Sequence, residues 1–409
     1  LGLAAKTPFG VRKTASTEGV CLGIGTTGLP HIRQLWQEAQ GNLHALIAGV
    51  SGAGKTTSIL ALLLRLAAAA DHPTQVVFVD PIGKGKLLTD AVGAAGAFYE
   101  ISDQATINIL DPVADDLGGQ LAAVRPKLAM ILGRPEYIEG DEVLLRPYPF
   151  TTMELRAVDL ALERLYGIGG EFLHAMRTGS HPIPLLEALI TALHSVVADG
   201  VVEGQSILRE LTLLLKTSEG QRLWNQPTTL AWDFSHPITA YSFREVAKEL
   251  RPIYYSAIFS GMDEYVKHGQ RGVPRQHFIG CIDEFFVMRQ VPALGEYVRR
   301  ATKTWRNEGA GMWTMDQNIG TWFDSSVGDE GAGQMTAENV RIRLIFHLEG
   351  QDAARVEALY GDRLKPEDLR AIRTANAGEC VAMFGGEVEQ LTIALTDLET
   401  TALIAPVMR

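Results

Sequence analysis

The chain has 409 residues, 46% of them hydrophobic and 21% charged, a composition that predicts a globular protein of two or three structural units and excludes a disordered or fibrous chain. Its 37 lysines and arginines against 48 aspartates and glutamates give a net charge of −11, which excludes broad charge-driven binding of nucleic acid and leaves room only for a local contact. Three widely spaced cysteines, Cys21, Cys281 and Cys380, exclude a disulfide framework and a CxxC metal site, and they fit a reducing, cytoplasmic compartment.

The ends and apolar runs of the chain exclude a membrane span. The longest apolar run, 59–70, is interrupted by Arg65 and is too short to cross a bilayer. The chain begins with Leu1, and its first ten residues lack the charged-then-apolar order of a signal peptide. We therefore expect a fragment of a longer protein, in which a missing N-terminal part would carry any membrane contact.

The first part of the chain alternates strands with helices. Residues 44–49 (HALIAG) are a short apolar run that predicts a strand, and the Leu/Ala-rich stretch 56–70 predicts a helix. Residues 75–80 (QVVFVD) are β-branched and aromatic and stop at Pro81, which predicts a second strand. This alternation predicts an α/β fold with a parallel sheet.

The pattern changes to a helical period over residues 114–225. Three segments, near 153–167, 184–197 and 206–216, each place Leu, Ile, Val or Ala on one helical face, and a Gly/Pro-rich stretch at 133–150 divides the region. We predict an all-helical insert at 114–225 that separates residues 1–113 from 226–409. The insert lacks a glycine loop or strand-end acid, so we expect it to supply no phosphate or metal ligand and to contact partner proteins or a neighbouring subunit.

Strands resume after the insert, near residue 228. Residues 277–284, 311–316 and 341–348 are apolar runs that predict buried strands. Residues 378–395 contain two apolar runs around Gly385-Gly386, which predicts a C-terminal hairpin.

Residues 49–56, which we call the phosphate loop, read GVSGAGKT and match GxxxxGK[ST] without a mismatch. Glycines in such a loop let successive backbone N–H groups point at a phosphate, and the following helix adds the positive end of its dipole. We expect Lys55 to reach the β- and γ-phosphates of a nucleotide and the Thr56 hydroxyl to ligate Mg²⁺. The residues expected to bind the nucleotide are Ser51, Gly52, Ala53, Gly54, Lys55, Thr56 and Thr57.

Two carboxylates end the strand predicted at 277–284. Asp283 is expected to hold Mg²⁺, usually through water, and Glu284 to orient and deprotonate the attacking water. Cys281 lies inside this strand, where a small core residue is a more frequent role than a nucleophile.

The next predicted strand ends in Asp316-Gln317-Asn318. A glutamine at a strand tip beside the acid-bearing strand can hydrogen-bond the γ-phosphate or the water. The alternative is that Gln317 is only a solvated strand end.

A basic helix is predicted between these two strands, at 295–311. Arg299, Lys303 and Arg306 are spaced i, i+4, i+7 and share one face, and Arg300 lies beside them. Three interpretations of this helix are open. It has a solvated basic face, it has a DNA-facing patch, or it carries an interface arginine that acts on a neighbouring subunit's ATP. We take Arg306 as the first candidate for that arginine, with Arg343 second and Arg300 third.

These segments together resemble the C-terminal ATPase domain of type IV secretion and conjugative-transfer motors. That family comprises the TraC-type proteins, the fourth component of VirB systems, within the HerA/FtsK superfamily. The resemblance rests on the phosphate loop in its context, on VVFVDP (76–81), INILDP (107–112) and CIDEF (281–285), and on the block from Arg306 to Gln317. It covers nearly the whole chain. It departs at Asp316, where the family has threonine, and at the pair Phe285-Phe286.

The resemblance implies a RecA-like P-loop core and Mg²⁺-dependent ATP hydrolysis that energises substrate transfer or pilus biogenesis. It also implies channel subunits and a coupling protein as partners, self-association as a hexamer, and a cytoplasmic, peripheral position at the inner face of the cell membrane. Two alternatives stay open. One is a hexameric DNA translocase, disfavoured by the net charge of −11. The other is a nucleotide-binding scaffold with negligible turnover, disfavoured because Lys55, Asp283, Glu284 and Gln317 are all present.

Overall fold

A computed structural model describes residues 19–38, 42–69, 74–102, 104–138, 142–229, 234, 236–268, 277–286, 292–323 and 337–404. The side chains at 135–144, 268 and 292–296 are outside that description. Within these ranges none of the helices combines the length and apolar character needed to cross a bilayer.

An eleven-stranded sheet organises the fold, in the order β2-β1-β13-β12-β11-β3-β10-β9-β4-β8-β5. The strands from β11 to β5 pair in parallel, and β12, β13, β1 and β2 extend the sheet with antiparallel pairs. The strands are β1 Val20–Gly25, β2 Pro30–Arg33, β3 Ala45–Ala48, β4 Thr74–Asp80, β5 Gly96–Ser102, β8 Ile238–Glu245, β9 His277–Ile282, β10 Ala310–Asp316, β11 Ile342–Ile345, β12 Glu379–Phe384 and β13 Glu387–Thr392.

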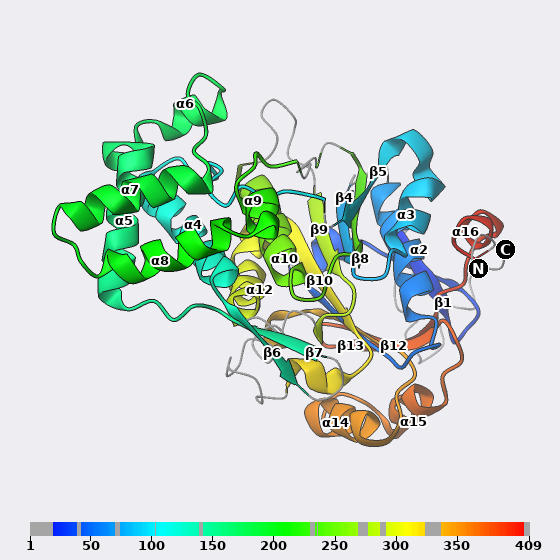
Figure 1. Cartoon of the computed structure of the whole chain (residues 1–409). Coiled ribbons are helices and arrows are strands. Elements are labelled where there is room, and N and C mark those ends of the chain that lie inside the picture. The colour runs from blue at the N-terminus through cyan, green and yellow to red at the C-terminus, as the bar shows by residue number, and fades with distance from the viewer. Residues whose placement is uncertain are drawn as a thin grey trace.

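Alternation of side chains along β4 shows why helices cover both faces of the sheet. Val76 and Phe78 belong to one buried cluster, which α2 and α3 cover, and Val77 and Val79 belong to another, which α10 and α12 cover. Figure 1 shows the two layers of helices on either side of the strands. The helices of the core are α1 Leu35–Glu38, α2 Lys55–Ala67, α3 Gly85–Val92, α10 Arg251–His268, α12 Pro292–Thr304, α14 Gly350–Tyr360, α15 Pro366–Thr374 and α16 Asp397–Leu403.

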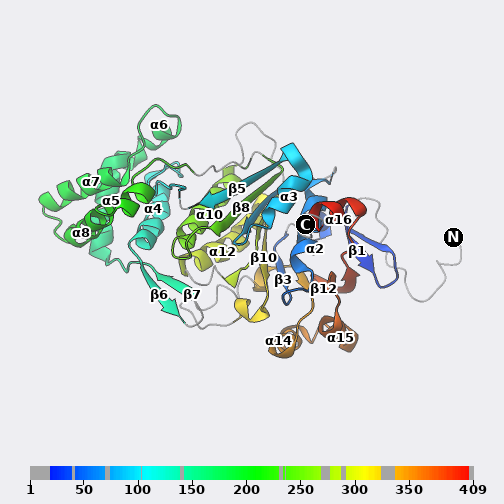
Figure 2. The same cartoon turned by 45° about the vertical axis from the view of Figure 1, so that its right-hand side comes forward.

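The region between β5 and β8 is mainly helical. Its helices pack on one another, α5 against α7 and α8, and α8 against α9. Figures 1 and 2 both place α5–α8 at the end of the molecule away from α2, α3 and α16. The helices are α4 Leu117–Ile131, α5 Thr152–Tyr166, α6 Leu173–Arg177, α7 Leu186–Ala198, α8 Gly204–Leu215 and α9 Ser218–Trp224.

Two details of this region differ from the prediction. The Gly/Pro-rich stretch is not only a break, because β6 Arg134–Ile138 and β7 Glu142–Arg146 form an antiparallel pair, so the insert is not all-helical. Within the described part of the chain, the first strand after it is β8, which begins at Ile238, and residues 226–229 form no strand. The boundaries of the insert at 114 and 225 stay predictions.

The INILDP segment, residues 107–112, joins the core to the insert. The Asn108 amide donates to the Pro184 carbonyl oxygen at 2.9 Å, and the Tyr166 hydroxyl donates to the Leu110 carbonyl oxygen at 2.8 Å. Asp111 accepts a hydrogen bond from the Thr228 hydroxyl. These contacts cross from residues before the insert to residues within and after it. The segment therefore has a structural role that its sequence alone did not indicate.

The C-terminal hairpin is confirmed. β12 and β13 pair with Phe384 opposite Glu387 across Gly385-Gly386, where Gly385 has a φ of 60° that favours glycine. β1 pairs with β13, so the two ends of the described chain complete the antiparallel side of the sheet.

Candidate active site

The phosphate loop lies between β3 and α2, as the sequence predicts. Gly54 precedes α2 with a φ of 76°, and a Cβ atom there would lie 2.6 Å from the backbone nitrogen of Gly378, so only glycine fits. The loop is anchored to its neighbours by hydrogen bonds from the Val50 N–H to the His347 carbonyl oxygen, 2.9 Å, and from the Gly49 N–H to the Asp316 carbonyl oxygen, 3.3 Å.

Lys55 is buried at the first turn of α2. Its ammonium donates a hydrogen bond to the Gly49 carbonyl oxygen at 3.0 Å. Burial lowers the pKa of Lys55, and the carboxylates of Asp283, Asp316 and Glu284 oppose that shift. The lysine therefore faces the acids that the sequence assigns to the same site, although they lie more than 200 residues away along the chain.

The order of the strands brings these residues together. β10 pairs in parallel with β3 on one side and with β9 on the other, so the carboxyl ends of all three strands meet at one edge of the sheet. The phosphate loop follows β3, Asp283-Glu284 follows β9, and Gln317 follows β10. The sheet edge next to the phosphate loop is where α/β folds bind ligands.

Asp283 is buried, and its two carboxylate oxygens differ. Oδ1 accepts a hydrogen bond from the Glu284 N–H at 3.0 Å, whereas Oδ2 is buried without a hydrogen-bond partner. Burial, together with repulsion from Asp80, raises the pKa of Asp283 to about 6. A buried acceptor without a donor is costly, so this atom is suited to a cation.

Glu284 and Gln317 contact each other. The Gln317 Nε2 donates to Glu284 Oε1 at 3.0 Å. Among the described residues Glu284 is also the non-glycine residue with a positive φ, 53°, a conformation that costs roughly 1–2 kcal/mol.

Asp316, the departure from the family pattern, has a structural role. Its Oδ2 accepts from the Phe286 N–H at 2.7 Å and its Oδ1 from the Asn318 N–H at 3.1 Å. It thus ties the tip of β10 to the segment that carries Glu284. Burial raises the pKa of Asp316 to about 6. Phe285 is buried and stacks on Trp322 with ring centroids 5.6 Å apart, which accounts for one of the two phenylalanines.

The residues present fit a Mg²⁺ ion bound together with phosphates. Thr56 offers a hydroxyl on the first turn of α2, and Asp283 offers the unpartnered Oδ2. In the described ranges no three His, Cys, Asp or Glu side chains gather as a metal site. This donor set suits Mg²⁺, which takes few protein ligands and keeps water or phosphate in its other positions.

A further lysine at the site was missed from the sequence. Lys84, in the loop after β4, donates a hydrogen bond from its ammonium to the Thr56 hydroxyl at 3.3 Å. Asp80, at the end of β4, accepts from the N–H groups of Ile82 and Gly85 and so shapes this loop. The signal was available in the segment VDPIGKGK, in which a second lysine follows a strand-end acid.

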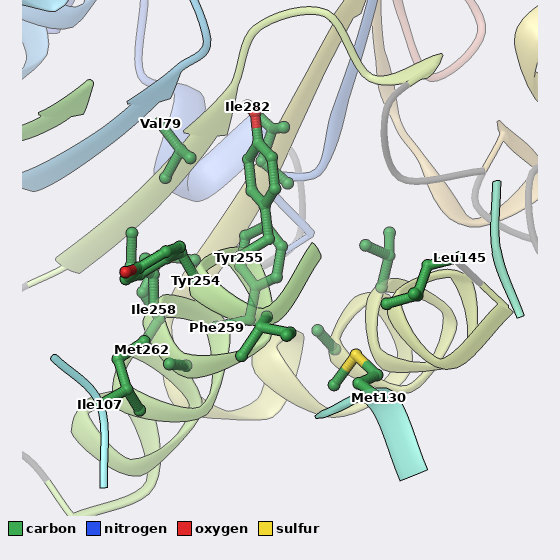
Figure 3. Close-up of a cluster of buried hydrophobic side chains, with 14 of the residues drawn as sticks. Val79, Ile107, Met130, Leu145, Tyr254, Tyr255, Ile258, Phe259, Met262 and Ile282 are labelled. Atoms are coloured by element: carbon green, nitrogen blue, oxygen red, sulfur yellow. The ribbon is translucent and has the colours of Figure 1, made fainter. Parts of the chain in front are cut away.

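Tyr255 lies beneath the strand ends that carry the acids. Figure 3 shows its side chain rising from α10 toward Val79 and Ile282, the residues that precede Asp80 and Asp283. The hydroxyl is buried without a hydrogen-bond partner. Burial raises the pKa of Tyr255, and Asp80, Asp283 and Glu284 add to that shift, so the hydroxyl stays protonated beside the acids.

The candidate arginines lie in different environments. The basic helix is shorter than predicted, because α12 ends at Thr304 and residues Trp305–Glu308 form a 3₁₀ turn, so the proposed i, i+4, i+7 face is interrupted before Arg306. Arg306 is exposed just before β10, at the end of that strand opposite Gln317. It lies close enough to His44, which precedes β3, to lower the pKa of that histidine.

The other two arginines are engaged within the chain. Arg343 is buried in β11, donates to the Ala337 carbonyl oxygen at 3.0 Å and lies over the Tyr360 ring. Arg300 lies 3.6 Å from the Asp263 carboxylate. Burial of Arg343 does not fit a residue that reaches into a neighbouring subunit. Arg300 is exposed beside Asp263, and Arg306 stays the first candidate. Cys281 is buried in β9, where burial raises its pKa, and its core role is confirmed.

Comparison with known proteins supports the fold. No family model matches the sequence, and no curated protein does. Among solved structures, VirB4 of Thermoanaerobacter pseudethanolicus matches with a TM-score of 0.71 and 18% identity, over 94% of this chain and 99% of that chain. This chain shares the fold of VirB4. The RecA-like α/β fold implied by the family resemblance is thereby confirmed.

The bacterial conjugative coupling protein TrwB matches less closely. One TrwB structure has a TM-score of 0.59 and 12% identity, over 94% of this chain and 91% of that chain. Another, of TrwB in complex with ADP and Mg²⁺, has a TM-score of 0.58 and 13% identity, over 93% and 90% of the two chains. Both comparisons cover the core and the insert together, so the likeness extends beyond the phosphate loop.

Proposed function

We propose that this chain is the ATP-hydrolysing motor domain of a type IV secretion or conjugation system, which energises substrate transfer or pilus biogenesis. One observation carries the proposal: Lys55, Asp283, Glu284 and Gln317 follow three adjacent parallel strands, β3, β9 and β10, and lie together beside the phosphate loop. Likeness to VirB4 over nearly the whole chain supports the choice of system.

Each residue has a distinct part in the reaction. The loop N–H groups and the Lys55 ammonium bind the β- and γ-phosphates, which requires Lys55 to leave the Gly49 carbonyl oxygen. Glu284 accepts a proton from the attacking water as the water oxygen bonds to the γ-phosphorus and the bond to the ADP oxygen breaks. Gln317 holds the Glu284 carboxylate and orients the water. A Mg²⁺ ion held by Thr56 and Asp283 would neutralise phosphate charge.

An arginine from a neighbouring subunit completes this proposal. Arg306 lies at the opposite end of the strands from its own phosphate loop, so it can act only on another copy's ATP. We propose a hexameric ring in which Arg306 serves the adjacent site. Channel subunits and a coupling protein are the expected partners, at the inner face of the cell membrane. TrwB in complex with ADP and Mg²⁺ supports the nucleotide and the ion.

The test is an ATPase assay with two lysine variants. Lys55→Ala should abolish hydrolysis, whereas Lys86→Ala should not, because Lys86 is exposed and pairs with Asp90. Adding DNA separates the motor from the hexameric DNA translocase, whose rate should rise with DNA. A folded wild-type protein that binds ATP and does not turn it over would favour the scaffold instead.

A further inference from the structure

Lys84 has a position that the proposed function leaves unexplained. It comes from the loop between β4 and α3, and its ammonium donates to the Thr56 hydroxyl at 3.3 Å. Thr56 is one of the two residues that fit Mg²⁺. The lysine therefore contacts a group that a divalent cation would also need.

The loop is built to hold Lys84 in this position. Asp80 is fully buried and accepts hydrogen bonds from the N–H groups of Ile82 and Gly85, both at 2.8 Å. Gly83, immediately before Lys84, has a φ of 85°, in the region that favours glycine. A short, clamped loop fixes the Cα of Lys84, so its side chain has a limited region to explore.

The electrostatic interactions of the Lys84 ammonium agree with this position. Lys84 attracts the carboxylates of Asp80 and Asp283 and thereby opposes the upward shift of both pKa values. It also repels Lys55 and helps to lower the pKa of that residue. The Lys84 ammonium thus contacts Thr56 and acts electrostatically on both acids, of which Asp283 has a buried Oδ2 without a hydrogen-bond partner.

Without a cation this group of residues would be unfavourable. Two buried carboxylates, Asp80 and Asp283, repel each other, and they would repel an incoming diphosphate as well. A positive charge beside them removes part of both costs. Mg²⁺ would supply that charge when it is bound, and Lys84 supplies it from within the chain, with a smaller part from Lys55 at Asp283.

We propose that Lys84 acts as a stand-in for the divalent cation: its ammonium neutralises the Thr56–Asp283 site when the ion is absent, allows nucleotide to bind there, and is displaced by Mg²⁺. The inference rests on the proposed nucleotide site and adds to it a role for a residue outside the phosphate loop. It predicts that Lys84 contributes strongly to nucleotide affinity without Mg²⁺ and much less when Mg²⁺ is bound.

The experiment measures ADP affinity in EDTA and in saturating Mg²⁺, which involves no turnover. Lys84→Met should weaken ADP binding in EDTA by about tenfold or more, as expected for a lost charge-assisted contact, and should change it little in Mg²⁺. The Mg²⁺ concentration that half-saturates the gain in affinity should fall, because the competing ammonium is gone. Lys84→Arg should keep most of the affinity in EDTA.

The control is Lys86→Met, since Lys86 lies two residues away, is exposed and pairs with Asp90. It should change neither affinity. An equal loss in EDTA and Mg²⁺ for Lys84→Met, or no loss in either, would overturn the inference while leaving the nucleotide site intact. If the wild-type chain bound no ADP in EDTA or in Mg²⁺, the proposed function itself would be contradicted. That result differs from the two outcomes for Lys84→Met, in which the wild-type chain still binds ADP.

Discussion

Gln317 donates a hydrogen bond to Glu284 at 3.0 Å, although the two residues follow different strands and lie 33 positions apart. β9 and β10 are parallel neighbours, so the residues that follow them are brought to the same edge of the sheet. The contact gives Gln317 a defined partner, where the sequence left a solvated strand end as an alternative. It also links the residue proposed to take a proton with a residue that can sense its state.

This contact predicts a selective effect of Gln317→Ala. The substitution should reduce the ATP hydrolysis rate by about 10² to 10⁴-fold, since it removes the group that positions the general base. ADP affinity should stay within about threefold of wild type, because Gln317 is exposed and outside the phosphate loop. Gln205, exposed on α8, offers a matched control. Parallel losses of rate and ADP affinity for Gln317→Ala would contradict this assignment.

His44 predicts how stability depends on pH. It is fully buried before β3, its Nδ1 accepts from the Met312 N–H at 2.9 Å, and burial followed by the charge of Arg306 lowers its pKa from 6.5 to about 4. The unfolded chain therefore binds more protons than the folded one between these values, so stability falls as pH drops below 6.5. The loss should reach about 1 kcal/mol at pH 5.5.

His44→Asn isolates this effect, because its side-chain oxygen can accept from the same N–H group and does not titrate. Denaturant unfolding of both proteins at pH 8 and pH 5.5 gives the difference directly. The variant should be less stable at pH 8, owing to the smaller side chain, and the gap should narrow by about 1 kcal/mol at pH 5.5. An equal difference in unfolding free energy between the two proteins at both pH values would contradict the lowered pKa of His44.

Arg306 predicts dependence on a neighbouring subunit. An arginine supplied across an interface raises phosphoryl-transfer rates by roughly 10³ to 10⁵-fold. Activity per subunit should therefore rise with protein concentration, and Arg306→Ala should remove that rise while ADP affinity stays nearly intact. Arg300→Ala is a useful control, because Arg300 lies against Asp263 within the chain.

Mixing two inactive variants tests the same point more sharply. Rings that contain both Lys55→Ala and Arg306→Ala subunits include interfaces with an intact lysine facing an intact arginine. Part of the activity should return in them. Mixed rings that are verified by mass and stay inactive would count against Arg306.

The parts of the site that could be predicted are those that a short, continuous segment of sequence determines. A strand, a glycine loop and a helix follow one another at 45–67, so the phosphate loop could be located without tertiary information. Asp283 and Glu284 could be assigned because they end an apolar strand. Gln317 needed one further inference, that the two acidic and polar strand ends lie side by side.

Other parts depend on contacts that no short segment encodes. Lys84 follows β4 and Thr56 follows β3, three places away in the sheet, and the two residues meet because α2 and α3 pack side by side. Tyr255 lies near the acids because α10 packs beneath β4 and β9. Arg343 looked available in sequence and is buried by the fold. The β6–β7 pair was missed because a Gly/Pro-rich stretch conceals strand propensity.

The identity of the nucleotide left on Glu284→Gln tests the central claim most directly. The variant keeps the shape and the Gln317 contact site but cannot accept a proton. Loaded with ATP and Mg²⁺, then analysed chemically after many wild-type turnover times, it should still hold ATP, whereas the wild-type protein should hold ADP. Recovery of ADP from Glu284→Gln at the wild-type rate would contradict the account, as would ATP that stays intact on the wild-type protein.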